Sequence, residues 1–152
     1  RPTLIYRLGY DKNISVIARF IRRFSFFPLL GEAKGLRQPV HAQDVAFACV
    51  AALNSEKTVN RAYNISGGEI LSYREMVERV FLKLAKKPRF VILPLGIFRI
   101  ALLFLIFLPA FRNWSPAMAE RMNQDLVFDH QDASNDFGFA PGKFNLDRED
   151  LP

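Results

Sequence analysis

The chain has 152 residues, half of them hydrophobic and 24% charged, so it can bury a core and a disordered chain is excluded. Its net charge of +6 lies in the first forty residues, which hold eight lysines or arginines and two acids. This basic quarter favours either a solvated helix face or an anionic partner: a phosphate-bearing small molecule, an acidic membrane face or nucleic acid.

The first six residues, rich in β-branched and aromatic side chains, predict a strand. The chain begins with Arg1 rather than Met and enters this strand without a capping segment. We therefore expect a piece of a longer protein, with a cleaved precursor as the alternative.

Two further elements follow the first strand. Residues 14–24 have an apolar stripe at helical spacing, which predicts an amphipathic helix with Asn13 as its N-cap. Residues 26–30 then predict a short extended segment that ends at Gly31.

Residues 44–53 are apolar on every side, so we expect a helix sandwiched between other elements. Asp44 lies near its start, where a carboxylate can cap free amides. The single cysteine, Cys49, is expected to be a small buried hydrophobe. One cysteine excludes a disulfide framework, and a cytoplasmic location is the default.

The middle of the chain predicts a strand over residues 62–66 and another over residues 89–93. Between them, Ser72 and Glu75 form a capping-box pattern that opens an amphipathic helix, and Glu75 is spaced to pair with Arg79. The inward side chains expected of this helix are Val77, Val80, Phe81 and Leu84. Alternating strands and helices favour an α/β or mixed α+β fold with a small sheet.

Residues 95–111 include the most hydrophobic segment of the chain. The uninterrupted apolar run is shorter than the ~18–20 residues needed to cross a bilayer, so we expect a buried or interface helix, with a surface anchor as the alternative. A helix over residues 115–125 has an apolar seam of Met118, Met122 and Leu126. A last helix over residues 131–137 is expected to end at Gly138.

The sequence holds no metal-ligand spacing, Walker loop, Gly-x-Gly-x-x-Gly fingerprint or Tyr-x-x-x-Lys pair. It therefore lacks a self-contained catalytic group of residues. Residues 36–46 form a basic extended segment that leads into the apolar helix. Arg37 can grip a phosphate with its guanidinium, whereas His41 is either a ligand contact or a packed histidine bonded to backbone.

Four motifs come in the order found in the NAD-dependent epimerase/dehydratase family of extended and atypical short-chain dehydrogenases/reductases, which the chain resembles over nearly its whole length. The motifs are Arg1-Pro2-Thr3-Leu4-Ile5-Tyr6, Arg37-x-Pro-Val-His-x-x-Asp-Val-Ala, Tyr63-Asn64-Ile65-Ser66-Gly67-Gly68-Glu69 with Ser72-Tyr73-Arg74-Glu75, and Ala133-x-x-x-Phe137-Gly138-Phe139-x-Pro141.

The resemblance implies a modified Rossmann protein, of which residues 1–152 are the carboxy-terminal, substrate-binding portion and residues 1–6 the last cofactor-side strand. It implies that Pro2 and Thr3 lie beside the nicotinamide and that Arg37 contacts the pyrophosphate of a nucleotide sugar. His41 and Arg7 complete our candidate substrate contacts. The catalytic Tyr-x-x-x-Lys pair would precede residue 1, so the chain alone is expected to be inactive and to hold neither NAD nor NADP.

Two positions depart from the family pattern: Arg7 stands where glycine is usual, and Leu4 where several epimerases have a polar contact. With the apolar helix, they favour an alternative, a non-catalytic NADPH-binding accessory subunit like that of respiratory complex I. The expected partner is a nucleotide sugar or other anionic small molecule, with no nucleic acid. A homodimer and a peripheral membrane contact through residues 97–111 stay open.

Overall fold

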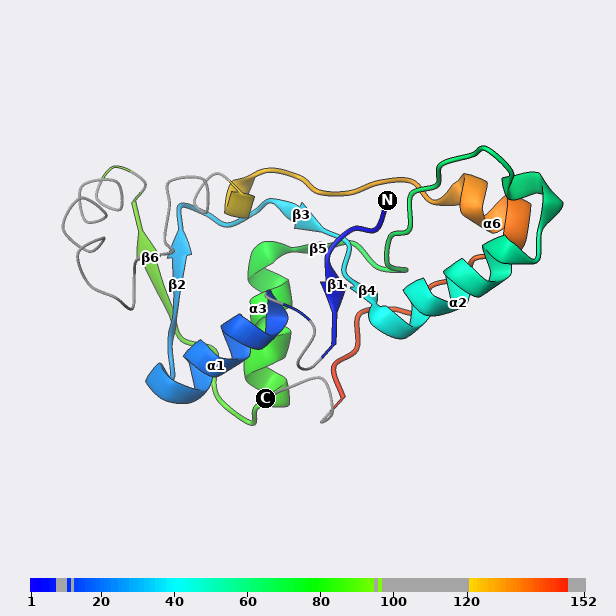
Figure 1. The fold of residues 1–152 in the computed structure, drawn as a ribbon. Coiled ribbons are helices and arrows are strands. Elements are labelled where there is room, and N and C mark those ends of the chain that lie inside the picture. The colour runs from blue at the N-terminus through cyan, green and yellow to red at the C-terminus, as the bar shows by residue number, and fades with distance from the viewer. Residues whose placement is uncertain (8–10, 12, 95, 97–120, 148–152) are drawn as a thin grey trace, which may run out of the picture.

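The computed structural model describes residues 1–7, 11, 13–94, 96 and 121–147 (Figure 1). The apolar helix predicted over residues 95–111 and most of the helix predicted over residues 115–125 lie outside the described residues. Among the helices that are described, none is long and apolar enough to span a membrane.

The described residues form short strands and helices in alternation. In chain order they are β1 (Ile5–Tyr6), α1 (Ile14–Phe24), β2 (Phe27–Leu30), β3 (Leu36–Arg37), β4 (Val40–His41), α2 (Ala42–Leu53), the 3₁₀ turn η1 (Glu56–Thr58), β5 (Leu71–Ser72), α3 (Tyr73–Lys83), β6 (Phe90–Leu93) and α6 (Gln131–Phe137). The predicted mixed α/β class is therefore confirmed.

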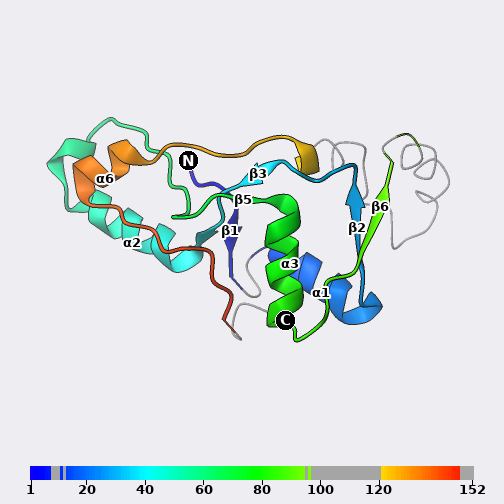
Figure 2. The same cartoon turned by 180° about the vertical axis from the view of Figure 1, so that it is seen from behind.

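The strands pair in three separate two-stranded sheets within the described part of the chain. β1 pairs with β4 and β2 with β6, both in parallel, whereas β3 and β5 are antiparallel. Figures 1 and 2 show β2 and β6 at one end of the molecule, α2 and α6 at the other, and α1 and α3 packed between them. Parallel pairs require crossover connections, which α1 and α3 supply.

α1 covers the predicted residues, but another side chain caps it. Asn13 makes no side-chain cap bond. Instead Asp11 accepts from the backbone N–H groups of Asn13 and Ser15, each at 2.9 Å, and from the Ser15 hydroxyl at 2.6 Å. A carboxylate satisfies the free amides of the first turn better than an amide side chain, because it carries a full negative charge.

α3 begins with the predicted capping box between Ser72 and Glu75. Its predicted inner side chains Val77, Val80 and Phe81 are fully buried. The predicted Glu75–Arg79 pair makes no direct contact, because the Glu75 carboxylate bonds back to Ser72. Arg79 instead makes two bonds to Glu69, at 2.8 and 2.6 Å. The hydrogen bond to Glu69, together with the charges of Glu69 and Glu75, raises the pKa of Arg79.

Residues 62–66 do not form the predicted strand beyond a single bridge between Ile65 and Pro2. Ile65 exchanges backbone hydrogen bonds with Arg1 and Thr3 on either side of that bridge. The Gly67 N–H then donates to the Gln38 carbonyl at 3.3 Å, so after the bridge to Pro2 the chain contacts the residues before β4.

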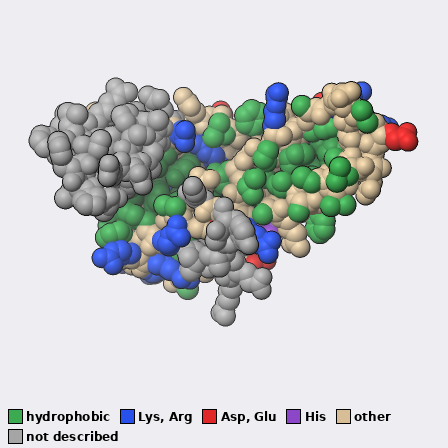
Figure 3. Space-filling model, in the orientation of Figure 1, with side chains coloured by type: hydrophobic (Ala, Val, Ile, Leu, Met, Phe, Trp, Pro, Cys, Tyr) green, Lys and Arg blue, Asp and Glu red, His purple; other side chains and the backbone are tan. Residues whose placement is uncertain are grey.

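α2 was expected to be sandwiched, and this expectation is wrong. Of its residues only Ala48 is buried, whereas Phe47 is 64%, Val50 57% and Leu53 87% exposed. The predicted buried Cys49 is also exposed. The helix packs on β1, β4, η1 and α6 with one side only, and apolar side chains cover this part of the surface in Figure 3. We call Phe47, Val50 and Leu53 the α2 stripe.

Two hydrophobic clusters form the core of the described residues. The larger cluster lies around α1, α3 and β2 and includes Ile21, Leu29 and Phe81. The smaller lies between β4, α2 and α6, with Val40, Ala48, Ile65, Ala133 and Phe139 as its buried members. α6 has its predicted bounds and ends at Gly138, whose φ of 71° is the left-handed conformation expected of a helix-ending glycine.

Candidate functional site

A cavity of about 440 Å³ lies where the segment before β1 and strand β3 meet α3 and residues 121–128. Its described lining combines polar, basic and apolar side chains: Pro2, Thr3, Leu4, Asn13, Arg37, Tyr73, Arg121, Met122, Leu126 and Phe128. Of the predicted site residues it brings together Pro2, Thr3 and Arg37. A concave site with a few convergent polar groups is typical of small-molecule binding.

Arg37 is only 2% exposed, yet it lies in the wall of this cavity. Its Nη1 donates to the carbonyls of Leu36 and Gln124, each at 2.7 Å, and its Nη2 donates to the carbonyl of Arg121. Burial lowers the pKa of the guanidinium, which stays a cation. Within the described residues these bonds leave the Nε–H unused.

Tyr73, the first residue of α3, lies beneath Arg37, whose guanidinium carbon is 5.4 Å from the ring centroid. This is cation–π geometry. Burial raises the pKa of the Tyr73 phenol to about 12. The phenol is therefore neutral at physiological pH and can donate a hydrogen bond, but it is a poor general base.

Gln38 fixes the segments around the cavity to one another. The side chain is buried; its Nε2 donates to the Gly67 carbonyl at 2.9 Å, and its Oε1 accepts from Phe128 N–H at 3.1 Å. Its backbone carbonyl accepts from the Thr3 hydroxyl at 2.5 Å. One residue thus joins the segment before β1, the turn at Gly67 and Phe128 around the same cavity.

His41 and Arg7 are not among the described cavity-lining residues. His41 is the N-cap of α2: its Nδ1 accepts from the Gln43 N–H at 3.2 Å, and its ring meets Tyr6 edge-on. Arg7 is exposed beyond the end of β1. Asp44, the predicted cap of α2, instead accepts from the Gly142 N–H at 3.1 Å.

Ser66 and His130 lie 2.6 Å apart, which resembles a serine–histidine catalytic pair. However, the Ser66 hydroxyl donates to the Phe128 carbonyl at 2.8 Å and is fully buried. The hydroxyl proton of Ser66 is therefore used in the bond to Phe128, and His130 Nδ1 donates to the Ser66 oxygen rather than accepting from it. The contact holds residues 128–130 in place and does not activate a nucleophile.

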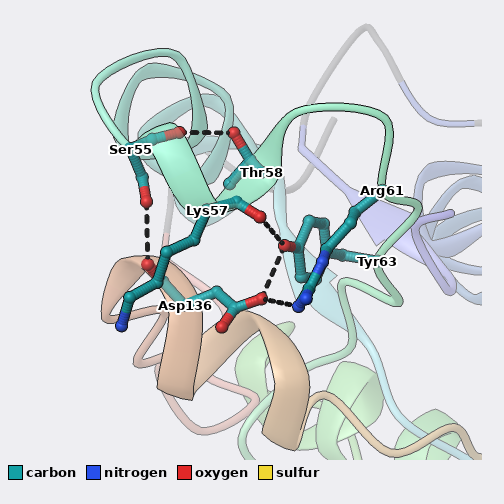
Figure 4. A network of polar contacts seen from close by, with 6 residues as sticks. All are labelled: Ser55, Lys57, Thr58, Arg61, Tyr63 and Asp136. Carbon is teal, nitrogen blue, oxygen red and sulfur yellow. Dashed lines mark hydrogen bonds and ion pairs between the residues drawn. The ribbon is translucent and has the colours of Figure 1, made fainter.

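A second polar network joins η1 to α6, away from the cavity (Figure 4). Asp136 accepts from Arg61 at 2.8 Å and from the Tyr63 hydroxyl at 2.7 Å, and its backbone carbonyl accepts from Ser55 at 2.9 Å. The Tyr63 hydrogen bond, with the nearby Arg61 charge, lowers the pKa of the Asp136 carboxyl. Burial and the Asp136 carboxylate raise the pKa of Tyr63.

The cavity also contains residues that sequence reasoning did not select, chiefly Arg121, Tyr73 and Asn13. Arg121 is exposed and adds a second cation beside Arg37. Two of the three carbonyls that accept from Arg37 are 84 and 87 residues away in sequence, so no local pattern connects the two segments. With Arg37 and Arg121 in its described lining, the cavity can bind an anion.

No family model matches the chain. It is 31% identical, over 88 residues, to the NADH dehydrogenase [ubiquinone] 1 alpha subcomplex subunit 9 of Arabidopsis thaliana mitochondria, covering 57% of this chain and 22% of that protein. It is 26% identical over 141 residues to the uncharacterized protein y4nG of Sinorhizobium fredii, covering 93% of this chain and 35% of that one.

Solved structures resemble the chain over 93% of its length at low sequence identity. One is RMD from Pseudomonas aeruginosa complexed with NADPH, with a TM-score of 0.64, 17% identity and 41% of that chain covered. Another is UDP-glucuronic acid 4-epimerase from Bacillus cereus with UDP-glucuronic acid and NAD, with a TM-score of 0.64, 16% identity and 38% covered.

A third is the dTDP-glucose 4,6-dehydratase DesIV from Streptomyces venezuelae with NAD and TYD bound, with a TM-score of 0.60, 19% identity and 37% covered. The chain thus spans about two fifths of the length of these structures, and less of the curated relatives. At these identities the likeness concerns the fold. The chain has the fold of the matching part of nicotinamide-dependent epimerases and dehydratases.

Proposed function

We propose that this chain is the substrate-binding portion of an NAD(P)-dependent nucleotide-sugar epimerase, dehydratase or reductase. The observation that carries the proposal is the cavity in which Arg37 and Arg121 lie together with Pro2 and Thr3. Two cations in one concave wall suit the paired phosphates of a nucleotide sugar. The epimerase and dehydratase structures that share the fold support the same ligand class.

The proposal divides the work between this chain and the remainder of a longer protein. The chain's described cavity lining has no group that titrates near neutral pH, and Tyr73 stays protonated. Its residues bind and orient the ligand. The dinucleotide, NAD or NADP, and the proton-transfer residues belong to the remainder, so we expect the isolated chain to be inactive.

The two arginines have different parts in this site. Arg37 is held by three carbonyls, so it presents a fixed positive charge to the cavity. Arg121 is exposed at the cavity, and its side chain has no bond to another described residue, so it can adjust to a ligand. We assign phosphate binding to this pair, with Arg121 as the residue whose replacement tests the site without disturbing the fold.

The experiment measures UDP and dTDP binding calorimetrically in the full-length protein. Arg121→Gln should weaken binding at least about tenfold, since a charge-assisted bond to phosphate contributes roughly 1.5–3 kcal/mol. Lys143→Gln, an exposed charge outside the described lining, is the control and should leave affinity unchanged. Equal affinity of the Arg121→Gln variant and the parent would remove the cavity from the proposal. Micromolar NAD binding by the isolated chain would refute the division of labour.

A second candidate is a non-catalytic NADPH-binding accessory subunit of a respiratory complex. The 88 residues that match the Arabidopsis NADH dehydrogenase subunit favour it. The two candidates differ in the residues before Arg1: an intact Tyr-x-x-x-Lys pair supports the enzyme, and its loss supports the subunit. Comigration of the full-length protein with NADH dehydrogenase activity on a native gel, without turnover of nucleotide sugars, would establish the subunit.

A further inference from the structure

The end of α1 and the loop before β6 are joined into one corner of the molecule. The Lys86 ammonium donates to the carbonyls of Ile21 and Arg22, at 3.0 and 2.9 Å, and to the Ser25 hydroxyl at 2.9 Å. The Phe27 N–H donates to the Arg89 carbonyl at 2.9 Å, which fixes the other end of the loop. The basic side chains of both segments are therefore held close together.

We call Arg22, Arg23, Lys86, Lys87 and Arg89 the basic corner. Neither residues 13–30 nor residues 82–94 contain an acid. Within the described part of the chain, the side chains of Arg22, Lys87 and Arg89 have no hydrogen bond or ion pair. Figure 3 shows Lys and Arg side chains grouped over α1. This unneutralised charge requires an anionic partner or solvent.

A small cavity opens within the basic corner. Its volume is about 210 Å³, and it is lined by Ser25, Lys86, Lys87 and Arg89. Lys87, Arg89 and the Ser25 hydroxyl provide donors for a phosphate group, and the Lys86 ammonium, whose three N–H groups are already bonded, adds its positive charge. The cavity is separate from the one that holds Arg37, with which it shares no described residue.

Exposed apolar side chains flank these cations. Phe24, the last residue of α1, is 48% exposed and carries the Arg23 guanidinium over its ring at 5.6 Å. Val91 and Ile92 of β6 are 46% and 58% exposed. Cations interleaved with exposed aromatic and aliphatic groups are typical of surfaces that lie at the boundary between lipid headgroups and acyl chains.

The sequence from the middle of α3 onward favours a lipid surface as the partner. No Asp or Glu occurs from residue 79 to residue 119, and this stretch includes the most apolar segment of the chain. A nucleic acid would also neutralise the positive charge, but it would not bury the exposed aliphatic side chains of β6. Charge complementarity together with exposed apolar groups favours a membrane surface.

We propose that the basic corner docks on an anionic phospholipid surface, with a lipid phosphate in the cavity at Ser25 and the Phe24 ring at headgroup level. This function is additional to binding in the Arg37 cavity. Each cation near such a surface adds about a fivefold increase in partitioning at low salt. Because these cations lie on one side of the molecule, they would hold that side against the membrane surface.

Cosedimentation of the 152-residue chain with vesicles tests the proposal. Phosphatidylcholine vesicles that contain phosphatidylglycerol should bind the chain, and high salt should release it. Pure phosphatidylcholine vesicles should bind it at least tenfold more weakly. Equal binding to both would overturn the proposal, because apolar adhesion through the α2 stripe would then explain it.

Two double variants locate the binding surface. Arg22→Gln with Lys87→Gln should lower binding to the anionic vesicles at least tenfold; both side chains are exposed, so the fold is expected to persist and circular dichroism checks it. Lys34→Gln with Lys143→Gln removes the same charge elsewhere and should bind nearly as the parent does. Equal loss in both variants would assign binding to net charge alone. Tighter binding to single-stranded DNA than to anionic vesicles would assign the corner to nucleic acid.

Discussion

Arg37 connects two segments that are distant in sequence. Its guanidinium reaches the carbonyls of Arg121 and Gln124 while it rests on the Tyr73 ring. The sequence identifies Arg37 as a phosphate-binding candidate from its extended, basic setting. Its second role, as a cross-link to residues 121–124, depends on tertiary packing that no local pattern contains.

Replacing Arg37 by Met should lower the free energy of unfolding by about 2–4 kcal/mol, because three partly buried carbonyl bonds lose their charged donor. Arg121→Gln, an exposed change at the same cavity, should stay within about 0.5 kcal/mol of the parent. Urea unfolding of both variants measures the difference. Similar midpoints for the two would show that the carbonyl bonds contribute nothing to stability.

At Asp136, the lowered pKa predicts a pH dependence of stability. The carboxylate contributes stability above the ordinary carboxyl pKa of about 4, and this contribution is lost as the pH falls through the lower folded-state pKa. Asp136→Asn should therefore reduce stability at neutral pH and flatten the acid side of the profile. Urea midpoints over the acid range, with the exposed Asp132→Asn as control, test this. Parallel profiles for parent and Asp136→Asn would contradict it.

Among the elements, those set by local signals agree with the sequence prediction. α1 and α6 have the predicted bounds, and the Ser72–Glu75 capping box is present, because caps and a helix-ending glycine act within one turn. The predicted burial of α2 fails because burial depends on what covers a helix. The hydropathy of a residue shows that its side chain is apolar, but it does not show whether another element packs against that side chain.

Gly67 shows how closely two elements approach. A Cβ atom at this position would lie 1.8 Å from the Pro39 carbonyl oxygen. Gly67→Ala should therefore destabilise the fold by roughly 3 kcal/mol or more, since backbone must move. Gly142→Ala meets only the Asp44 carboxylate, at 3.7 Å, and is the matched control. Thermal unfolding compares them, and equal melting temperatures would mean that the turn at Gly67 relaxes easily.

On the scale of the whole molecule, the exposed α2 stripe and the basic corner lie at opposite ends of the described fold (Figures 1 and 3). Monomeric proteins rarely expose a contiguous apolar stripe of this kind. The stripe therefore predicts self-association of the isolated chain at high concentration.

Phe47→Ser with Leu53→Ser should reduce that association and the binding of a hydrophobic dye, with stability within about 0.5 kcal/mol of the parent. Analytical ultracentrifugation measures the association. Ile70→Ser, which removes an apolar side chain that is 52% exposed outside the stripe, is the control and should change little. Association that persists in the double variant would place the contact elsewhere.

The two hydrophobic clusters have a consequence for local opening. Among the residues that the structure describes, the cluster between β4, α2 and α6 has five buried members, whereas the one around α1 and α3 has many more. A region with few buried contacts opens at lower free energy than the global unfolding transition. Backbone amides of α2 and α6 should thus exchange with deuterium well before those of α1 and α3. A uniform exchange rate across all four helices would mean that the molecule opens as a single cooperative unit.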